Sequence, residues 1–372
     1  MKPNNTPAHA QEMLRRQRLR PPQTLTIAIT GVCNLRCRHC WVEAGEASSA
    51  PHVPVQTLRR LLGEFAALAG SGVRLTGGEP LCHPGWLEIM RLCRALGFES
   101  LVLQTNAMLL TDAHAFALGA LDFAGLSVQV SLDGAGAPSH DLVRGEGAFD
   151  LAVAGIRRLV GAGLGRRLTI AFTEMAHNLE EIPTLLELAT ELGVASVVTG
   201  SLVTGGRAGR GSPLAPPSRD QYLGLIDRYA NDTRFRTRYD AIATVAALEW
   251  LRGDAPRGEC CTFAENPYLT PDGRLYPCLL CHTHAYAVSG TFGKGLPSAF
   301  AEAAPLWASL LRISRSRAEA LTACGDCPAR LTCAGGCMGR AWGSCGDLLA
   351  ADDRCGLRRA AYQLANPDRS VP

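Results

Sequence analysis

The chain has 372 residues, of which 47% are hydrophobic and 19% are charged, and its formal net charge is only +3. This length and composition are typical of two domains of ordinary size that bury a large core. The small net charge argues against a dedicated nucleic-acid or membrane-surface binder. No uncharged apolar run reaches the roughly 18 residues of a membrane span, and residues 1–20 lack the apolar stretch of a secretory signal, so we expect a cytoplasmic protein.

Between residues 26 and 203, short apolar strands alternate with amphipathic helices. The predicted strands are Thr26–Thr30, Val73–Thr76, Leu101–Gln104, Ser127–Leu132, Leu168–Phe172 and Ser196–Ser201. The segments between them carry apolar residues at helical spacing, as at Leu58, Leu61 and Phe65. Strands that alternate with helices predict a parallel sheet, open or closed into a barrel, with functional side chains at the carboxyl ends of its strands.

A stretch rich in glycine and proline, residues 205–217, marks the clearest domain boundary. A helical stretch around residues 220–251 follows it, and a cysteine-rich region begins at Cys260. We divide the chain into a basic N-terminal segment (1–25), a barrel region (26–205), a linker with bridging helices (206–255), a cysteine-rich domain (256–360) and a tail (361–372).

The 15 cysteines are placed unevenly. Three lie within residues 33–40, ten lie between residues 260 and 355, and only Cys82 and Cys93 lie elsewhere. We interpret these two as packing residues, because Cys93 falls on the apolar stripe of its helix. In a cytosolic protein, clustered cysteines more often ligate metal or do redox chemistry than form disulfides. The two groups therefore predict two metal-binding regions.

The first group, Cys33-Asn-Leu-Arg-Cys37-Arg-His-Cys40, directly follows the first predicted strand. Three thiolates in one short loop can hold three irons of a [4Fe–4S] cluster and leave the fourth iron open, whereas a structural zinc site needs four ligands. The spacing resembles the signature of the radical S-adenosylmethionine (SAM) superfamily, with His39 and Trp41 as bulky neighbours of the last cysteine. The resemblance implies that SAM chelates the open iron and yields a 5′-deoxyadenosyl radical. Zinc or buried thiols are the alternative.

Further segments that resemble the same family end the next strands in order. Gly77-Gly78-Glu79-Pro80 resembles the segment that binds the amino group of SAM, and its glycines let a ligand approach the backbone closely. The resemblance makes Ser131 a candidate for contact with the ribose and Arg144 a candidate partner of the SAM carboxylate. For each residue the alternative is a structural role in its loop. The full set of predicted SAM-binding residues is Gly77, Gly78, Glu79, Pro80, Asn106, Ser131 and Arg144.

The second cysteine group resembles the SPASM extension of radical SAM enzymes that mature peptides and proteins. It contains a Gly-x4-Cys element at residues 273–278 and a Cys-x2-Cys-x5-Cys-x3-Cys element at residues 324–337, followed by one distal cysteine. The resemblance assigns an outer auxiliary cluster to Cys324, Cys327, Cys333 and Cys355. It assigns an inner auxiliary cluster to Cys261, Cys278 and Cys337, and we take Cys260 as the fourth ligand because it lies just upstream. In place of Cys260, the inner cluster could use Cys281, Cys345 or an open iron, or be a [2Fe–2S] centre; a zinc ribbon is the alternative for the region. His282 and His284 are expected to be solvated.

We therefore expect an α/β fold, a partial (β/α)6 barrel of the TIM type followed by a loop-rich, cysteine-rich SPASM domain. The expected cofactors are SAM and up to three [4Fe–4S] clusters. The resemblance implies that the substrate is a ribosomally made peptide, modified by a C–C or C–S cross-link or a related oxidation. The expected partners are a separate leader-binding protein, because only 32 residues precede Cys33, and a flavodoxin- or ferredoxin-type reductant. No nucleic acid or membrane is expected among them.

The sequence leaves three other functions as alternatives. One is maturation of tetrapyrrole side chains, as in the haem d1 and alternative haem pathways, and another is a non-catalytic metal-binding scaffold. The third, a sulfatase maturase, is disfavoured because Leu279 follows Cys278 where that family has a catalytic Asp. The sequence identifies no catalytic acid or base of its own.

Overall fold

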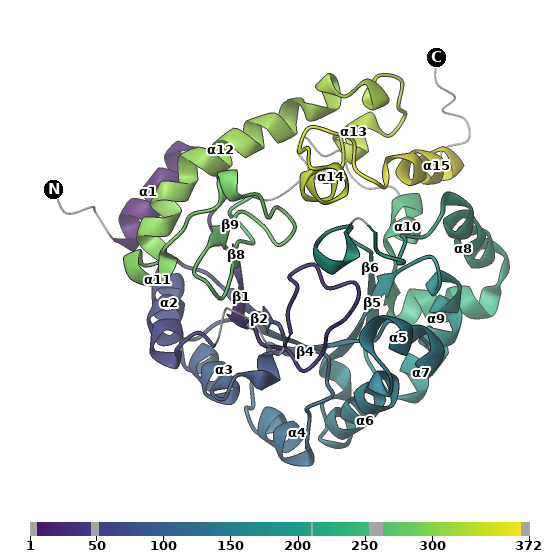
Figure 1. Ribbon diagram of the computed structural model, residues 1–372, viewed down its shortest axis with the longest axis horizontal. Coiled ribbons are helices and arrows are strands. Elements are labelled where there is room, and N and C mark those ends of the chain that lie inside the picture. Colours follow the sequence, from purple (N-terminus) through teal and green to yellow (C-terminus); the bar gives the residue numbers. More distant parts are fainter. Residues whose placement is uncertain (1–5, 46–51, 210, 253–262, 366–372) are drawn as a thin grey trace.

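The computed structural model describes residues 6–45, 52–209, 211–252 and 263–365. Their strands form one curved sheet in the order β7-β6-β5-β4-β3-β2-β1-β8-β9 (Figure 1). The long strands are β1 (Thr24–Thr30), β2 (Gly72–Gly77), β3 (Ser100–Thr105), β4 (Leu126–Ser131), β5 (Leu168–Glu174) and β6 (Ser196–Ser201). The short strands are β7 (Ala243–Thr244), β8 (Tyr268–Leu269) and β9 (Leu275–Tyr276). All six predicted strands are confirmed, with ends within two residues of those expected.

Every neighbouring pair of strands is parallel except β8 and β9, which are antiparallel. The order has two ends, so the sheet of the described residues is an open barrel, which confirms the expected partial barrel. Helices cover its outer side, with α2, α3, α4, α6 and α7 in a ring around the strands (Figure 1). The helices before the cysteine-rich region are α1 (Pro7–Arg16), α2 (Val55–Ala67), α3 (Trp86–Ala95), α4 (Asp112–Gly119), α5 (Ala137–Arg144), α6 (Ala148–Gly161), α7 (Ile182–Glu191), α8 (Arg219–Asn231), α9 (Thr233–Ile242) and α10 (Ala246–Glu249).

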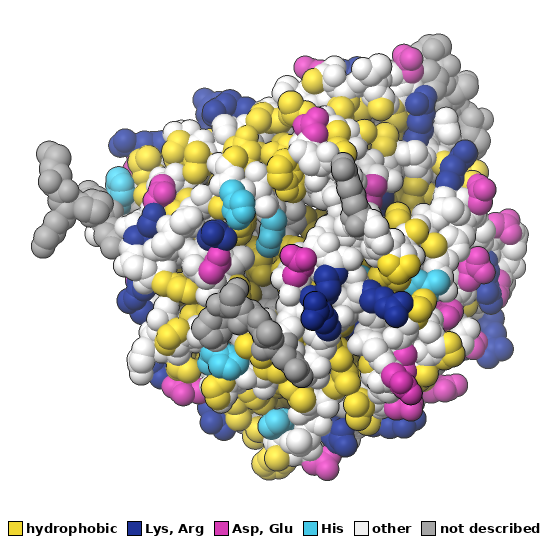
Figure 2. All heavy atoms as spheres, in the orientation of Figure 1, with side chains coloured by type: hydrophobic (Ala, Val, Ile, Leu, Met, Phe, Trp, Pro, Cys, Tyr) yellow, Lys and Arg dark blue, Asp and Glu magenta, His cyan; other side chains and the backbone are white. Residues whose placement is uncertain are grey.

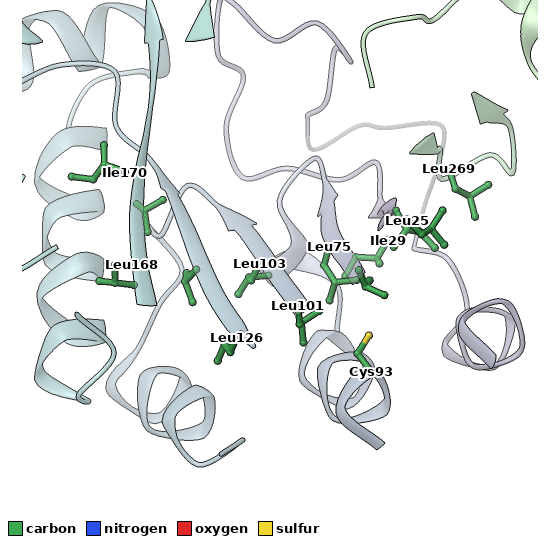
Figure 3. Packing of buried hydrophobic residues seen from close by; sticks show 14 of the residues in the cluster. Leu25, Ile29, Leu75, Cys93, Leu101, Leu103, Leu126, Leu168, Ile170 and Leu269 are labelled. Atoms are coloured by element: carbon green, nitrogen blue, oxygen red, sulfur yellow. The ribbon is translucent and has the colours of Figure 1, made fainter. Parts of the chain in front are cut away.

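The main core lies between the strands and this ring of helices. Figure 3 shows leucines of neighbouring strands, among them Leu75, Leu101 and Leu126, pointing into the same apolar layer as Cys93 of α3. Each fully buried leucine stabilises the fold by roughly 1.5–3 kcal/mol. Cys93 is fully buried there, and burial raises the pKa of its thiol to about 12. This environment agrees with a packing role for Cys93.

The C-terminal part of the chain is built onto the barrel. It contains α11 (Thr291–Lys294), α12 (Leu296–Ala320), α13 (Arg330–Cys333), α14 (Met338–Cys345) and α15 (Cys355–Ala365). β8 pairs with β1 through Thr26–Tyr268 and Ile27–Leu269, so this region extends the sheet. The long helix α12 runs beside α1 and crosses the side of the ring that the other helices leave open (Figure 1). Among the described helices, none has both the length and the apolar character needed to span a bilayer.

Candidate active site

A cavity of about 460 Å³ lies at the carboxyl ends of β2 to β6. All three cysteines of the first group, Cys33, Cys37 and Cys40, line it. Of the seven predicted SAM-binding residues, six line it as well: Gly77, Gly78, Glu79, Asn106, Ser131 and Arg144. Pro80 instead begins a short 3-10 helix, Pro80–Cys82, behind the wall and is buried. The structure thus brings together residues that are more than 100 positions apart in the sequence.

The cysteine loop follows directly from β1. Cys33 and Cys37 are buried and Cys40 is half-buried, and the backbone N–H of Leu35 donates to Cys33 Sγ at 3.4 Å. Burial raises the pKa of the Cys33 thiol to about 12, and burial also raises the pKa of Cys37. The apoprotein therefore favours neutral thiols, whereas iron ligation requires thiolates. The donor set fits a cluster with one open iron, and its binding would release protons.

The two glycines of the Gly-Gly-Glu-Pro segment face the chain rather than open space. A Cβ on Gly77 would lie 2.3 Å from the carbonyl oxygen of Thr30, and one on Gly78 would lie 2.2 Å from that of Val32. The two segments are also joined by backbone hydrogen bonds: the Gly78 N–H donates to Thr30 O and the Glu79 N–H donates to Val32 O, both at 2.8 Å. The glycines were expected to admit a ligand. The structure shows that they also let the end of β2 lie against the entry to the cysteine loop.

Glu79 is a buried carboxylate that joins the ends of β2 and β3. It accepts hydrogen bonds from the Leu81 N–H at 3.1 Å, Thr105 Oγ1 at 2.7 Å and the Asn106 N–H at 2.8 Å. Burial raises the pKa of Glu79, and these hydrogen bonds oppose that shift. Asn106 Nδ2 in turn donates to Asn34 Oδ1 of the cysteine loop at 2.8 Å. The network fixes three chain segments around the cavity, and the predicted contact of Glu79 with SAM remains a prediction.

Arg144 is held in place by Asp133, a residue that the sequence analysis did not select. The Arg144 Nε donates to Asp133 Oδ2 at 2.7 Å, and both side chains are nearly inaccessible to solvent. Burial alone would raise the pKa of Asp133, but Arg144 and His39 hold it well below its usual range. The terminal nitrogens of Arg144 lie 3.9 Å from Cys37 Sγ and 3.5 Å from His39 Nε2. The ion pair therefore orients the guanidinium toward the cysteine loop.

His39, which lines the cavity, has a buried nitrogen that a bound ligand could satisfy. Its Nδ1 atom is buried and has no hydrogen-bond partner within the described residues. Burial lowers the pKa of His39 to about 4, so the imidazole is neutral near pH 7. A buried nitrogen without a partner costs free energy unless a bound group satisfies it.

The segment that was expected to be a linker contributes to this site. Arg207 donates from Nε to Cys37 O and from Nη2 to Ala44 O, both at 2.8 Å. Gly206 has φ +53°, and a Cβ there would lie 2.6 Å from Cys40 O. Sequence analysis missed both residues, because a glycine-rich stretch is also typical of a domain boundary.

The second cysteine group is only partly within the described residues, since Cys260 and Cys261 lie outside them. The four thiols assigned to the outer cluster lie close enough for their charges to interact: burial raises the pKa of Cys324, and negative charge on Cys355, Cys333 and Cys327 raises it further. Among the described cysteines no disulfide forms. No three His, Cys, Asp or Glu side chains in the described part of the chain are placed to hold a single metal ion.

The remaining candidates for the inner cluster have different environments. Cys278 and Cys337 are half-buried, and Cys281 is fully buried in the main core. Cys345 is exposed and lines a second cavity, of about 690 Å³, between the 203–216 segment and α14. This cavity shares Trp41 and Val203 with the first one.

Tyr268 of β8 and Tyr276 of β9 form an aromatic cluster with Trp41 and His282, which line the second cavity. The His282 ring stacks on Tyr276 with centroids 4.5 Å apart and on Tyr268 at 5.0 Å, and Trp41 meets it edge-on at 4.4 Å. The expectation that His282 is solvated is therefore wrong, because these rings half-bury it, and burial lowers its pKa to about 4. His284 is exposed as expected, and Figure 2 shows histidine side chains on this face over β8 and β9. Leu279, which follows Cys278, lines the first cavity.

Comparison with known proteins agrees with this geometry. Residues 27–202 match the family model of the Radical SAM superfamily. The chain is 27% identical to the AdoMet-dependent heme synthase of Methanosarcina barkeri over 351 residues, which cover 90% of this chain and 96% of the relative. It is 27% identical to the mycofactocin maturase MftC of Mycobacterium tuberculosis over 356 residues, which cover 94% and 87%.

Solved structures share the fold across both parts of the chain. Native anSMEcpe with bound AdoMet superposes with a TM-score of 0.71 at 17% identity, covering 93% of this chain and 100% of that one. Streptococcus suis SuiB bound to S-adenosylmethionine gives a TM-score of 0.70 at 16% identity, covering 92% and 79%. With the family match, the cysteine loop and the cavity taken together, residues 27–202 form a radical SAM domain.

Proposed function

We propose that the chain is a radical SAM enzyme that modifies a ribosomally made peptide by a C–C or C–S cross-link or a related oxidation. The observation that carries the proposal is the pair of adjoining cavities, one lined by Cys33, Cys37 and Cys40 and the other by apolar and glycine residues. The first would hold the cluster and SAM, and the second would hold the substrate. Trp41 lies in the wall of both, so the two ligands would meet beside it.

A radical SAM domain implies SAM and one [4Fe–4S] cluster, which would supply one-electron radical chemistry when bound. The chain's own residues position them and keep water out. Arg144, oriented by Asp133, would bind the SAM carboxylate with its terminal nitrogens. Phe172 and Leu279 give the first cavity apolar walls, which limit the access of water to a reactive radical.

The second cavity suits a peptide. It is lined by Leu280, Trp342 and several glycines, which leave room for a backbone, and by His282. The buried Nε2 of His282 has no hydrogen-bond partner within the described residues, and a peptide N–H would satisfy it. The mycofactocin maturase relative and the solved complexes of SuiB with precursor peptide SuiA and of anSMEcpe with the Cp18Cys peptide support this proposal.

Tetrapyrrole side-chain modification is the second candidate, and the heme synthase relative favours it. A tetrapyrrole carries several carboxylates, which are usually held by arginine or lysine. Among the described residues that line the second cavity there is no arginine or lysine, and the only carboxylate, Asp353, is paired with Arg340. This composition favours the peptide.

The proposal includes two auxiliary clusters. The outer one would use Cys324, Cys327, Cys333 and Cys355, whose thiols lie together. The inner one would use Cys278 and Cys337 with Cys260 and Cys261. The auxiliary clusters would provide the acceptor for the single electron that the substrate radical loses after hydrogen abstraction. A flavodoxin- or ferredoxin-type protein would supply electrons for SAM cleavage, and a separate protein would present the peptide leader.

The first experiment counts iron and SAM cleavage in the full chain. Anaerobic reconstitution should give roughly 10 to 12 irons per chain, the lower figure if the inner centre is [2Fe–2S]. Replacing Cys33, Cys37 and Cys40 together by Ala should remove about four irons and all 5′-deoxyadenosine formation. Cys93→Ala is the matched control and should keep both. Undiminished SAM cleavage in the triple variant, or about four irons with two zincs in the unsubstituted chain, would contradict the cluster assignment.

The second experiment identifies the substrate. The chain is incubated anaerobically with SAM, a reductant and a peptide encoded by a neighbouring reading frame, and the products are read by mass spectrometry. Loss of two hydrogens from the peptide, with one 5′-deoxyadenosine per turnover, is the expected result. Turnover of a tetrapyrrole without turnover of the peptide would establish the second candidate instead.

A further inference from the structure

A buried ion pair joins two residues on either side of Cys355 in the sequence, Asp352 before it and Arg358 after it. Arg358 on α15 pairs through Nη2 with Asp352 Oδ2, and the two side chains are 14% and 0% exposed. Arg358 also lies over the Trp250 ring, with its guanidinium carbon 5.3 Å from the centroid. An ion pair away from water stabilises a protein only when hydrogen bonds satisfy its remaining donors and acceptors. The partners of these hydrogen bonds therefore show which parts of the chain the ion pair holds in place.

The remaining hydrogen bonds reach both proposed auxiliary clusters. Arg358 Nη1 donates to Cys333 Sγ at 3.3 Å, and Cys333 belongs to the outer set. The backbone N–H of Cys337, in the inner set, donates to Asp352 Oδ2 at 2.8 Å. Asp352 Oδ1 accepts from the Arg354 N–H at 3.1 Å, which fixes the carboxylate next to Cys355. One ion pair is thus bonded to a ligand residue of each cluster.

The chain between Cys333 and Cys337 is shaped to admit this pair. Gly336 has φ +79°, and a Cβ there would lie 2.6 Å from Arg358 Nη1 and 2.7 Å from Asp352 Oδ2. Arg317, which is 1% exposed, donates to Gly336 O at 2.8 Å from the other side. Only glycine permits both this backbone conformation and this approach. The contact is therefore part of how the ligand loop is built.

We propose that the Asp352–Arg358 pair sets the reduction potential of the outer auxiliary cluster, and that Arg358 raises this potential. The inference rests on the auxiliary clusters of the proposed function. A reduced cluster carries more negative charge than an oxidised one. A hydrogen bond to a ligand sulfur and a nearby positive charge therefore favour reduction. Arginine keeps its charge at every accessible pH, so the effect is permanent. The carboxylate of Asp352 acts in the opposite direction on the outer cluster, and its pairing with Arg358 limits that effect.

The experiment measures potentials rather than turnover. The background is the Cys33, Cys37 and Cys40 to Ala triple variant, in which only auxiliary clusters contribute to the electron paramagnetic resonance signal. Redox titration should show that Arg358→Gln lowers the reduced-to-oxidised ratio of the outer cluster about tenfold at a fixed potential, which is roughly 59 mV for one electron. Asp352→Asn should shift the ratio the other way. Arg312→Gln, on the exposed side of α12, is the charge-matched control and should change nothing.

The outcomes separate this inference from the proposed function. Unchanged potentials in Arg358→Gln at full iron content, or an equal shift in Arg312→Gln, would overturn the role of the pair alone. An unsubstituted chain that binds only about four irons would overturn the auxiliary clusters and this inference together. If Arg358→Gln loses iron, two other variants decide the question. A higher cluster potential in Asp352→Asn, together with an unchanged potential in Arg358→Lys, supports the role of the ion pair. No rise in potential in Asp352→Asn overturns it.

Discussion

Gly78 offers a direct test of how the end of β2 positions the cysteine loop. Gly78 is not among the glycines with a positive φ, so the clash of the added methyl group is the main effect that we expect from Gly78→Ala. That Cβ would lie 2.2 Å from the carbonyl oxygen of Val32 and 2.6 Å from its carbonyl carbon. Both are backbone atoms, which cannot rotate away as a side chain can. Val32 directly precedes Cys33, so the clash acts on the first predicted cluster ligand.

The size of the displacement follows from the distances. Real Cβ contacts are essentially never shorter than 3.0 Å, so the Val32 carbonyl must move by at least 3.0 − 2.2 = 0.8 Å. The hydrogen bond from Glu79 N–H to the same oxygen, now 2.8 Å long, would be strained or lost. A misplacement of about 1 Å near reacting groups lowers a rate about 100-fold. We therefore expect Gly78→Ala to lower SAM cleavage by about two orders of magnitude while the auxiliary iron is kept.

The assay measures 5′-deoxyadenosine formation under dithionite, together with iron per chain. Gly63→Ala is the matched control, because a Cβ at Gly63 of α2 has no atom within 4 Å. That variant should keep full activity and gain roughly 0.5–1 kcal/mol of stability. A Gly78→Ala protein with full iron and an unchanged cleavage rate would refute the reasoning.

Three further predictions concern stability. Burial lowers the pKa of His140 from 6.5 to about 4. As the pH drops from 6.5 to 4, the unfolded chain protonates His140 before the folded chain does, so the free energy of unfolding falls. His140→Gln should reduce that loss by up to about 3 kcal/mol, measured by thermal unfolding at a series of pH values. Arg340→Met removes a buried partner of Asp353 and the donor to Ser201 O and Leu202 O, so it should cost about 3–5 kcal/mol and expose the C-terminal region to limited proteolysis; normal resistance would contradict this. Cys93→Ala should lower the unfolding temperature by an amount equivalent to about 1 kcal/mol without loss of iron, and loss of iron would show that Cys93 is more than a packing residue.

The sequence was sufficient for the strands and for most of the first cavity. Strand positions follow from local apolar patterns, and the carboxyl ends of parallel strands must meet at one edge, which brings Asn106 and Ser131 near Cys33. Asp133 could have been selected too, since it is a carboxylate directly after a strand with an arginine, Arg144, in the following helix.

Other parts of the site depend on contacts that no local pattern encodes. Arg207 bonds to Cys37 O, 170 positions earlier, from a stretch whose composition is that of a linker. His282 is half-buried only because β8 and β9 bring Tyr268 and Tyr276 to either side of it. Those strands have two residues each, too few for an alternating pattern to be recognised.

The pairing of β1 with β8 also sets an order of events during synthesis. Thr26 of β1 pairs with Tyr268 of β8, which is made 242 residues later, so this edge of β1 has no partner strand until then. At about 5–20 residues per second, one edge of β1 stays uncovered for roughly 12 to 50 s after it leaves the ribosome. An uncovered apolar strand edge is a template for pairing with other chains. During this interval the strand that leads into Cys33 is open to aggregation, and the later synthesis of Tyr268 and Leu269 protects it.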